Sequence, residues 1–362
     1  MLHHLSKLLL LTSQSITSRS LSFTAQSFIV RSFIGGLALL MCLPAYSLDL
    51  TAMDKTASRF ENIKTIHIAH QGELIWAKAY NNANLHAVTN IKSASKSVMS
   101  ALIGIAIDKQ ILQGTEQTIA PLLADQLPAN PSPQLNQITI GHLLSMQAGL
   151  ERTSGRNYGK WVSSSNWVKE ALSWPFVEEV GGNMQYSTGN THLLSAILMR
   201  ASGEHTYRLA NQWLQGSGVR IESWETDPQG IPMGGNQLGM TPASLLAFGE
   251  LYRRGGVTEN GKQIIPESWI TQSWQPRTQS RFHRGQYGYG WFIQPFAGVQ
   301  GYYGWGYGGQ MIYVFPELEL TIAITSQENL PSGRTGYRDL LHSMVSRDII
   351  SPLTSLTRQQ QP

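Results

Sequence analysis

The sequence predicts a mixed α/β (α+β) fold, in which an antiparallel sheet built from both ends of the chain is flanked by helices and carries an inserted, mainly helical domain. Short β-type runs occur near both ends, helix signals fill the middle, and no repeat or low-complexity linker divides residues 48–362. Two separated β-rich ends pair most simply in one sheet. We therefore expect one domain over 48–362, with a sheet lobe of about 48–110 and 280–350 and a helical lobe of about 111–279.

The first 47 residues are expected to form a signal or targeting segment. They contain three basic residues and no acid, and Arg31 precedes an apolar stretch from Phe33 to Leu43. The following stretch, Pro44 to Ser47, has small residues at the spacing of a signal-cleavage site. An apolar stretch of this length is short for a membrane span, which favours a cleaved signal over an anchor. We expect an exported, periplasmic protein that contacts a membrane only if this segment is retained.

The composition is that of a globular protein with a sizeable core, because 41% of the 362 residues are hydrophobic and 14% are charged. Removing the three basic residues of 1–47 from the net charge of +4 leaves +1, so charge gives no case for nucleic-acid binding. The single cysteine, Cys42, lies in the N-terminal segment, which excludes a disulfide or a cysteine-ligated metal in the domain. His67 and His70 have H-x-x-H spacing but lack the glutamate of a zinc helix. We expect no metal and no cofactor.

Local patterns predict the strands at both ends. Residues 65–80 contain two β-type runs split at Gln71-Gly72, which predicts a hairpin. Near the other end, β-rich runs separated by Gly and Pro occur at 287–296, 311–315 and 318–325.

The middle of the chain contains helix start and stop signals. Thr241 as N-cap and Pro242 in the first turn predict a helix that runs to Arg254 and stops at Gly255. Residues 95–108 are apolar almost all round, which predicts a helix buried in a core. Further helices are expected over 140–146, 165–173, 190–201 and 337–346, and another begins at about 266.

The tetrapeptide Ser93-Ala94-Ser95-Lys96 opens the buried helix. Residues three apart lie on one face of a helix, so the Ser93 hydroxyl and the Lys96 amine can meet. Burial and the positive end of the helix dipole both favour the neutral amine of Lys96. A neutral amine beside a serine can take its proton and so make the hydroxyl nucleophilic. A chain of this length contains about one S-x-x-K by chance. The pattern therefore indicates a catalytic site only if further motifs accompany it.

Two later segments are candidates for further motifs of the same site. Tyr186 lies just before the predicted helix at 190–201, where a phenol can donate or accept a proton if a cation lowers its pKa. Residues 304–310, GWGYGGQ, contain G-x-G-x-x-G, but a β-rich run follows instead of the helix that a dinucleotide site requires. Their glycines are expected to let a sheet-edge backbone approach a ligand and offer N–H groups to a developing oxyanion.

In this order, the three segments resemble the motifs of the serine β-lactamase and penicillin-binding protein superfamily. The resemblance is greatest to its class C-like branch, which includes carboxylesterases and 6-aminohexanoate-dimer hydrolases. It extends from about residue 65 to 326 and includes the stretches ITIGHLLSMQAGLE and WETDPQGIPMGG. It implies a β-lactamase/transpeptidase-like fold and an acyl-serine hydrolase. By this resemblance Ser93 is the nucleophile, Lys96 its proton acceptor and Tyr186 the carrier of a proton to the leaving group.

The resemblance also implies an oxyanion hole. Its donors would be the backbone N–H of Ser93 and that of Tyr307, which follows Trp305 and Gly306 in the third motif. These residues, with Trp305 and Gly306, are the candidate oxyanion and substrate-binding residues.

The chain departs from the family pattern in two places. The third motif often begins with Lys or His, where this chain has Gly304. The second is often Tyr-x-Asn, where this chain has Tyr-Ser-Thr, and nearby Asn190 is the candidate replacement. Without the cation, efficient hydrolysis of β-lactams is not expected. A neutral or weakly polar acyl group suits the aromatic residues of this region, which are Tyr302, Tyr303, Trp305 and Tyr307.

We therefore expect a serine hydrolase that cleaves ester or amide bonds of small molecules through an acyl-Ser93 intermediate. Tyr158 and Trp161 are candidates for the rim of its cleft. Two alternatives stay open. One is β-lactamase or D,D-peptidase activity on β-lactams or cell-wall peptides, and the other is a catalytically silent, penicillin-binding-type sensor domain.

Overall fold

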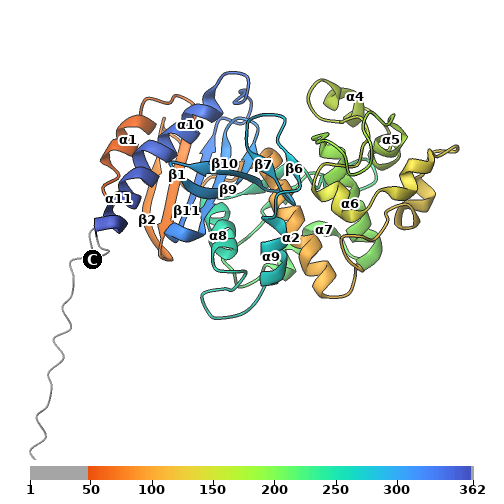
Figure 1. Cartoon of the computed structure of the whole chain (residues 1–362), viewed down its shortest axis with the longest axis horizontal. Coiled ribbons are helices and arrows are strands. Elements are labelled where there is room, and N and C mark those ends of the chain that lie inside the picture. The colour runs from red at the N-terminus through yellow and green to blue at the C-terminus, as the bar shows by residue number, and fades with distance from the viewer. Residues whose placement is uncertain (1–47, 360–362) are drawn as a thin grey trace, which may run out of the picture. The chain divides into compact units, whose positions relative to one another are not determined.

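The structure, a computed structural model, describes residues 48–359, so the expected signal segment lies outside the described residues (Figure 1). Its main sheet has the strand order β2-β1-β11-β10-β9-β8-β7-β6, and every neighbouring pair is antiparallel. The predicted sheet from both chain ends is confirmed, because N-terminal β1 pairs with C-terminal β11. The strands are β1 (Ile63–His70), β2 (Glu73–Ala79), β6 (Thr278–Gln279), β7 (Gln286–Tyr287), β8 (Phe292–Phe296), β9 (Val299–Gly306), β10 (Gln310–Phe315) and β11 (Leu320–Ser326).

The hairpin of β1 and β2 turns where the sequence predicts it. Gln71 and Gly72 both have positive φ values, 54° and 86°. Two successive residues with positive φ give a turn whose twist matches that of the paired strands. Glycine at the second position adopts this conformation without steric cost.

Helices cover both faces of the sheet (Figure 1). Side chains alternate along β10, so Met311, Tyr313 and Phe315 face a core shared with α1 (Thr51–Ala57) and α10 (Tyr337–Val345). The intervening Ile312 and Val314 face the core of α2 (Ser95–Asp108) and α8 (Pro242–Arg253). A π-helical turn continues α10 into α11 (Ser351–Gln359). The buried helix predicted at 95–108 therefore lies between the sheet and the helical lobe.

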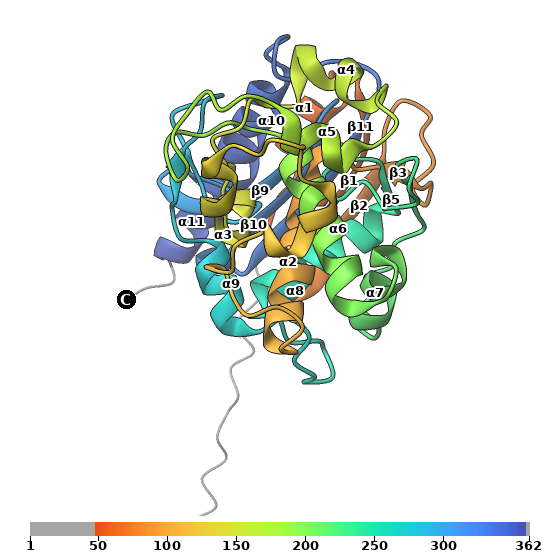
Figure 2. The same cartoon turned by 90° about the vertical axis from the view of Figure 1, so that its right-hand side faces the viewer.

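The helical lobe lies beyond α2 (Figures 1 and 2). The helices predicted at 140, 165 and 190 are present, whereas α4 and α7 are not among the predicted helices. In the described part of the chain, no helix is long and apolar enough to cross a membrane. The lobe contains α3 (Ile140–Leu144), α4 (Tyr158–Val162), α5 (Trp167–Ser173), α6 (Thr188–Ser202), α7 (Thr206–Trp213) and a small sheet of β3 (Thr89–Asn90), β5 (Leu238–Met240) and β4 (Ser223–Trp224).

The expected lobe boundary near residue 279 differs from the structure. Helix α8 packs on β10 and β11, and α9 (Glu267–Ser273) packs on α2. A Cβ on Gly249 of α8 would lie 2.6 Å from Thr321 Cγ2 of β11, so glycine allows this close contact. The N-cap and stop signals predict where α8 begins and ends in the sequence. They do not predict whether it packs on the sheet or in the helical lobe.

The glycine-rich third segment is not at a sheet edge, which corrects that expectation. It comprises the end of β9, the turn that follows and the first residue of β10, and β9 lies between β8 and β10 inside the sheet. Glycine has a low propensity for strands, so the sequence pattern does not predict β9. Packing explains the glycines, because a Cβ on Gly301 would lie 2.5 Å from Phe315 Cε1.

A buried side-chain hydrogen bond fixes the loop of residues 225–237 to α6. His192 Nε2 lies 3.0 Å from Asp227 Oδ2, and both side chains are fully buried. Asp227 Oδ1 also accepts hydrogen bonds from the backbone N–H groups of Gln229 and Ile231. These bonds form an Asx-type turn, with Gly230 at a φ of 79°.

Replacing Asp227 by Ala is expected to lower the free energy of unfolding by about 1–3 kcal/mol, because it leaves the buried His192 ring and two backbone N–H groups of the loop without their hydrogen-bond partner. Urea denaturation of the purified variant measures this loss. The control is Asp125→Ala, which breaks an exposed pair with Arg200 and should cost about 1 kcal/mol or less. Equal losses in the two variants would contradict a structural role for the buried pair.

Candidate active site

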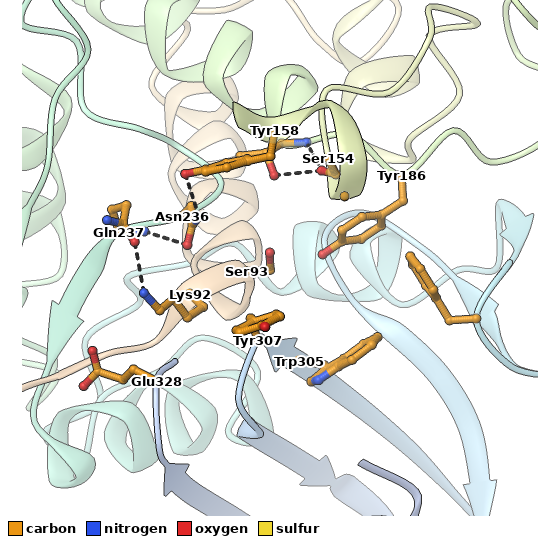
Figure 3. Close-up of a pocket in the computed structure, with 13 residues that line it drawn as sticks. Lys92, Ser93, Ser154, Tyr158, Tyr186, Asn236, Gln237, Trp305, Tyr307 and Glu328 are labelled. Carbon is orange, nitrogen blue, oxygen red and sulfur yellow. Dashed lines mark hydrogen bonds between the residues drawn. The ribbon is translucent and has the colours of Figure 1, made fainter. Parts of the chain in front are cut away.

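Ser93 and Lys96 meet at the start of α2. Residues Lys92–Ala94 form a 3-10 turn and α2 begins at Ser95, so Ser93 precedes the helix and Lys96 lies in its first turn. The two side-chain atoms, Ser93 Oγ and Lys96 Nζ, are 3.1 Å apart. Ser93 is half-buried and points into a cavity, whereas Lys96 is only 1% exposed (Figure 3). A solvent-accessible hydroxyl thus lies against a buried amine.

The surroundings of Lys96 favour its neutral form. Burial lowers the pKa of the Lys96 amine to about 7, and no carboxylate lies within ion-pair distance of it in the described residues. A neutral amine has two N–H groups and one lone pair. Lys96 Nζ is 2.7 Å from the carbonyl oxygen of Gly235 and 3.5 Å from Thr188 Oγ1, which can accept the N–H groups. The lone pair then remains for the Ser93 hydroxyl proton.

Gly235 is a site residue that the sequence analysis does not single out. A Cβ at this position would lie 2.3 Å from Thr191 Oγ1 and 3.1 Å from Lys96 Nζ. Glycine therefore lets the backbone carbonyl reach the amine. The stretch WETDPQGIPMGG contains it, but nothing in that pattern indicates a contact with Lys96.

Tyr186 comes to the same point from the segment before α6. Its side chain is only 8% exposed, and Lys96 Nζ lies over its ring, 4.9 Å from the centroid. Burial raises the pKa of the Tyr186 phenol well above its ordinary value, although a hydrogen bond with Ser93 opposes this shift. The condition under which Tyr186 would act as a base, a pKa lowered by a nearby cation, is not met. Near neutral pH Tyr186 is a neutral phenol, which can donate a proton.

A cavity of about 540 Å³ opens above Ser93 (Figure 3). Aromatic and polar side chains from distant parts of the chain line it together. They are Lys92, Ser93, Ser154, Gly155, Tyr158, Tyr186, Thr188, Asn236, Gln237, Phe282, Trp305, Tyr307 and Glu328.

The third motif reaches this cavity at the end of β9. Trp305 and Tyr307 line it, and Tyr307 is 49% exposed. A Cβ on Gly306 would lie 2.1 Å from the carbonyl oxygen of Ile91, so glycine lets the strand end approach the turn that holds Ser93. The oxyanion role of the Ser93 and Tyr307 N–H groups stays a prediction.

Gly304 has a packing reason to be glycine. A Cβ there would lie 2.9 Å from Ile312 Cγ2 and 3.0 Å from Ser97 Oγ of α2. A lysine or histidine at this position would therefore require its neighbours to move. The aromatic neighbours are also differently placed from the expectation, since Tyr303 is buried and Tyr302 stacks on Trp274, with ring centroids 4.1 Å apart.

Other candidates are divided between the cavity and the core. Asn190 does not line the cavity; it is buried in α6, and its Nδ2 has no hydrogen-bond partner among residues 48–359. Thr188 occupies the cavity wall instead. Tyr158 lines the cavity, whereas Trp161 is fully buried against Trp167. In the part of the chain that the structure describes, no cluster of three or more His, Cys, Asp or Glu side chains could hold a metal ion.

Several residues of the cavity wall have no sequence signal that marks them as functional. Ser154 Oγ lies 2.9 Å from Thr188 Oγ1, and Tyr158 accepts a hydrogen bond from Asn236 Nδ2 at 3.0 Å. The wall residues without a sequence signal come from loops and one 3-10 turn, where no periodic pattern marks a functional position. Ser154, Asn236, Gln237, Phe282, Glu328 and Lys92 fall in this group.

Structural comparison shows the same fold in proteins of low sequence identity. A protein from Bacillus anthracis described as a 6-aminohexanoate-dimer hydrolase has a TM-score of 0.66 at 20% identity, covering 83% of this chain and 81% of its own. EstCE1, described as a hydrolase with promiscuous acyltransferase activity, has a TM-score of 0.64 at 18% identity, covering 82% and 99%. A D-stereospecific amidohydrolase from Streptomyces sp. has a TM-score of 0.63 at 12% identity, covering 83% and 98%.

A search of curated proteins gave no match. The family model named Beta-lactamase, in contrast, matches residues 64–343. This range runs from β1 to α10 and includes Ser93, Lys96, Tyr186 and the end of β9. The expected superfamily and fold are thus confirmed. The chain belongs to the β-lactamase family.

Proposed function

We propose that this protein is a serine hydrolase that cleaves ester or amide bonds of small molecules through an acyl-Ser93 intermediate. The observation that carries this proposal is the 3.1 Å contact between Ser93 Oγ and a buried Lys96 amine whose pKa is lowered to about 7. A neutral amine in this position can act as the general base that a serine nucleophile needs. The cavity above Ser93 provides space for a small substrate.

The proposed reaction begins when Ser93 Oγ attacks the substrate carbonyl carbon and gives its proton to Lys96. The negative charge that develops on the carbonyl oxygen accepts hydrogen bonds from the backbone N–H groups of Ser93 and Tyr307. As the bond to the leaving group breaks, Tyr186 gives that group a proton and regains one from the Lys96 ammonium. Water then gives a proton to the neutral Lys96 amine as it attacks the acyl carbon, the bond between this carbon and Ser93 Oγ breaks, Ser93 Oγ takes the proton from Lys96, and the acid product leaves. General acid–base catalysis contributes about 10²–10⁴-fold, and an oxyanion donor contributes about 10²–10³-fold.

The test of this proposal is labelling with a fluorophosphonate probe, which reacts with activated serine hydroxyls. The wild-type protein should be labelled at one serine, and Ser93→Ala should not be labelled. Since Ser93 is half-buried at the cavity floor, its replacement by a smaller side chain leaves the surrounding packing in place. Equal labelling of the two proteins would reject the proposal.

Activity on β-lactams is the second candidate function, because the chain belongs to the β-lactamase family. The packing of Gly304 against Ile312 and Ser97 argues against it, since it leaves no cation at the start of the third motif. We expect short-chain esters to be hydrolysed faster than a chromogenic cephalosporin. The opposite order would favour the β-lactamase alternative, and stoichiometric acylation by a penicillin without turnover would favour the sensor alternative.

The pH dependence of ester hydrolysis follows from Lys96. Only its neutral form accepts the Ser93 proton, and burial places its pKa at about 7. We therefore expect kcat/KM to rise with pH as a single ionisation near pH 7 and to level off above it. Steady-state kinetics from pH 5 to pH 9 measures this profile. A rate that falls as the pH rises through 7 would contradict a neutral Lys96 base.

A further inference from the structure

The cavity contains a second lysine, Lys92, which the proposed reaction does not use. Lys92 Nζ donates a hydrogen bond to Gln237 Oε1 at 3.3 Å. Among residues 48–359, no carboxylate lies within ion-pair distance of Lys92 Nζ, and Glu328 of the same cavity pairs with Lys64 instead. Burying part of an ammonium beside a neutral amide alone leaves much of its charge uncompensated. The side chain is therefore available for an anionic group of a ligand.

The backbone of Lys92 is held in an unusual conformation. Its φ is 52°, a left-handed value that is uncommon for residues other than glycine. The side-chain oxygen of Asn90 accepts a hydrogen bond from the Lys92 backbone N–H at 2.9 Å, which stabilises the turn. Conformations of this kind persist where the surrounding structure imposes them, and they concentrate at functional sites. Here the turn directs Lys92 into the cavity directly before the candidate nucleophile (Figure 3).

Two neighbours, Glu225 and Asn90, fix the orientation of Gln237, whose side-chain oxygen accepts the hydrogen bond from the Lys92 ammonium. Gln237 Nε2 donates to Glu225 Oε2 at 2.8 Å. A carboxylate only accepts hydrogen bonds, so Gln237 must direct its NH₂ group to Glu225 and its oxygen to the cavity side. Asn90 Nδ2 also donates to that oxygen, at 2.8 Å. The hydrogen bonds that position the Lys92 ammonium are therefore already present in the protein without substrate.

The other charged residue of the cavity wall, Glu328, already has a partner. Its Oε1 lies 3.2 Å from Lys64 Nζ. Glu328 and Lys64 neutralise each other, so Lys92 is the charged residue of the cavity lining that has no ion-pair partner among residues 48–359. An anionic group is the complementary ligand for this part of the wall.

The cavity has two different sides (Figure 3). Lys92 and Gln237 lie on one side of Ser93, and Tyr186 and Trp305 lie on the other. In the proposed reaction Tyr186 gives its proton to the leaving group, which must then occupy the Tyr186 side. The acyl group extends toward Lys92. The expectation of a neutral acyl group rests partly on Trp305, which lies on the leaving-group side.

We propose that Lys92 selects substrates whose acyl group ends in a carboxylate. This inference rests on the proposed hydrolase function and names its substrate class as half-esters or half-amides of short dicarboxylic acids. The carboxylate binds the Lys92 ammonium by a charge-assisted hydrogen bond. Lys92 determines specificity and takes no part in proton transfer.

The experiment compares the mono-p-nitrophenyl ester of glutaric acid with neutral p-nitrophenyl butyrate. The measured quantity is the ratio of their kcat/KM values, which removes any general effect of a variant on catalysis. In the wild type this ratio should exceed one and should fall when salt is added, because salt screens a partly exposed charge. Lys92→Met keeps the aliphatic stem and should lower the ratio about tenfold, as the loss of a hydrogen bond to a charged group does. Lys92→Arg keeps the positive charge and should retain most of the wild-type ratio.

Lys169→Met is the matched control, because it removes the same charge from an exposed position on α5, outside the cavity. It should leave the ratio at the wild-type value. Hydrolysis of both esters with equal ratios in wild type and Lys92→Met would overturn the role of Lys92 while leaving the hydrolase proposal intact. Hydrolysis of neither ester would instead reject the hydrolase proposal, and with it this inference.

Discussion

Lys96→Met is expected to lower kcat/KM for ester hydrolysis by about 10³-fold, within the range for loss of a general base. The variant retains the length and apolar stem of the side chain but has no lone pair that can take the Ser93 proton. Its sulfur also cannot return a proton to Tyr186. Both halves of the proposed proton path therefore fail together.

Three comparisons separate this chemical effect from loss of structure. Lys96→Arg should be equally inactive, because a guanidinium keeps its proton at any pH used for the assay. Lys109→Met, at the exposed C-terminal end of α2, should retain wild-type activity. Thermal unfolding identifies any variant that is not folded. More than about a tenth of wild-type activity in folded Lys96→Met would exclude Lys96 as the base.

Tyr186→Phe is expected to have an effect that depends on the leaving group. An alkoxide or amine needs a proton as it departs, so hydrolysis of alkyl esters and amides should slow by about 10²–10⁴-fold. p-Nitrophenolate departs without protonation, and its esters should be affected much less. Kinetics with a series of esters of one acid and alcohols of increasing pKa measures this dependence as a steeper slope in the variant.

The packing around Tyr186 makes this variant well suited to the test. Its ring contacts those of Phe282 and Phe292, with centroids 5.2 and 6.0 Å away, and phenylalanine retains these contacts. Tyr287→Phe is the control, because it removes another buried hydroxyl from the same aromatic cluster, at a centroid distance of 6.1 Å. It should leave the slope unchanged. A uniform loss of rate over all leaving groups in Tyr186→Phe would contradict its role as proton donor.

The fold was predictable wherever local chemistry determines it. The turn at Gln71-Gly72 and the N-cap at Thr241, whose side chain accepts a hydrogen bond from the Ser244 N–H, both appear at the predicted positions. The β9 strand was not predictable from propensity, because tertiary contacts require its glycines: Gly301 lies against side chains of β8 and β10, and Gly306 lies against the backbone of Ile91. A single sequence does not show such contacts.

The candidate site was predictable where local geometry determines it and not where tertiary packing does. Ser93 and Lys96 are three residues apart, so local geometry alone brings them together. Tyr186 came from the order of the motifs, but the direction of its pKa shift depends on burial by Phe282, Tyr287 and Phe292, which tertiary packing provides. Asn190 is adjacent in sequence to the second motif, yet the turn of α6 buries it and leaves Thr188 at the cavity.

The measurement that tests the account most directly is identification of the acylated residue during turnover. The protein is mixed with a p-nitrophenyl ester, quenched in acid within milliseconds and digested, and the peptides are analysed by mass spectrometry. We predict an acyl group on Ser93 that forms in proportion to the initial burst of p-nitrophenol and disappears as the substrate is exhausted. Steady hydrolysis without an adduct, or with the acyl group on another residue, would contradict the account.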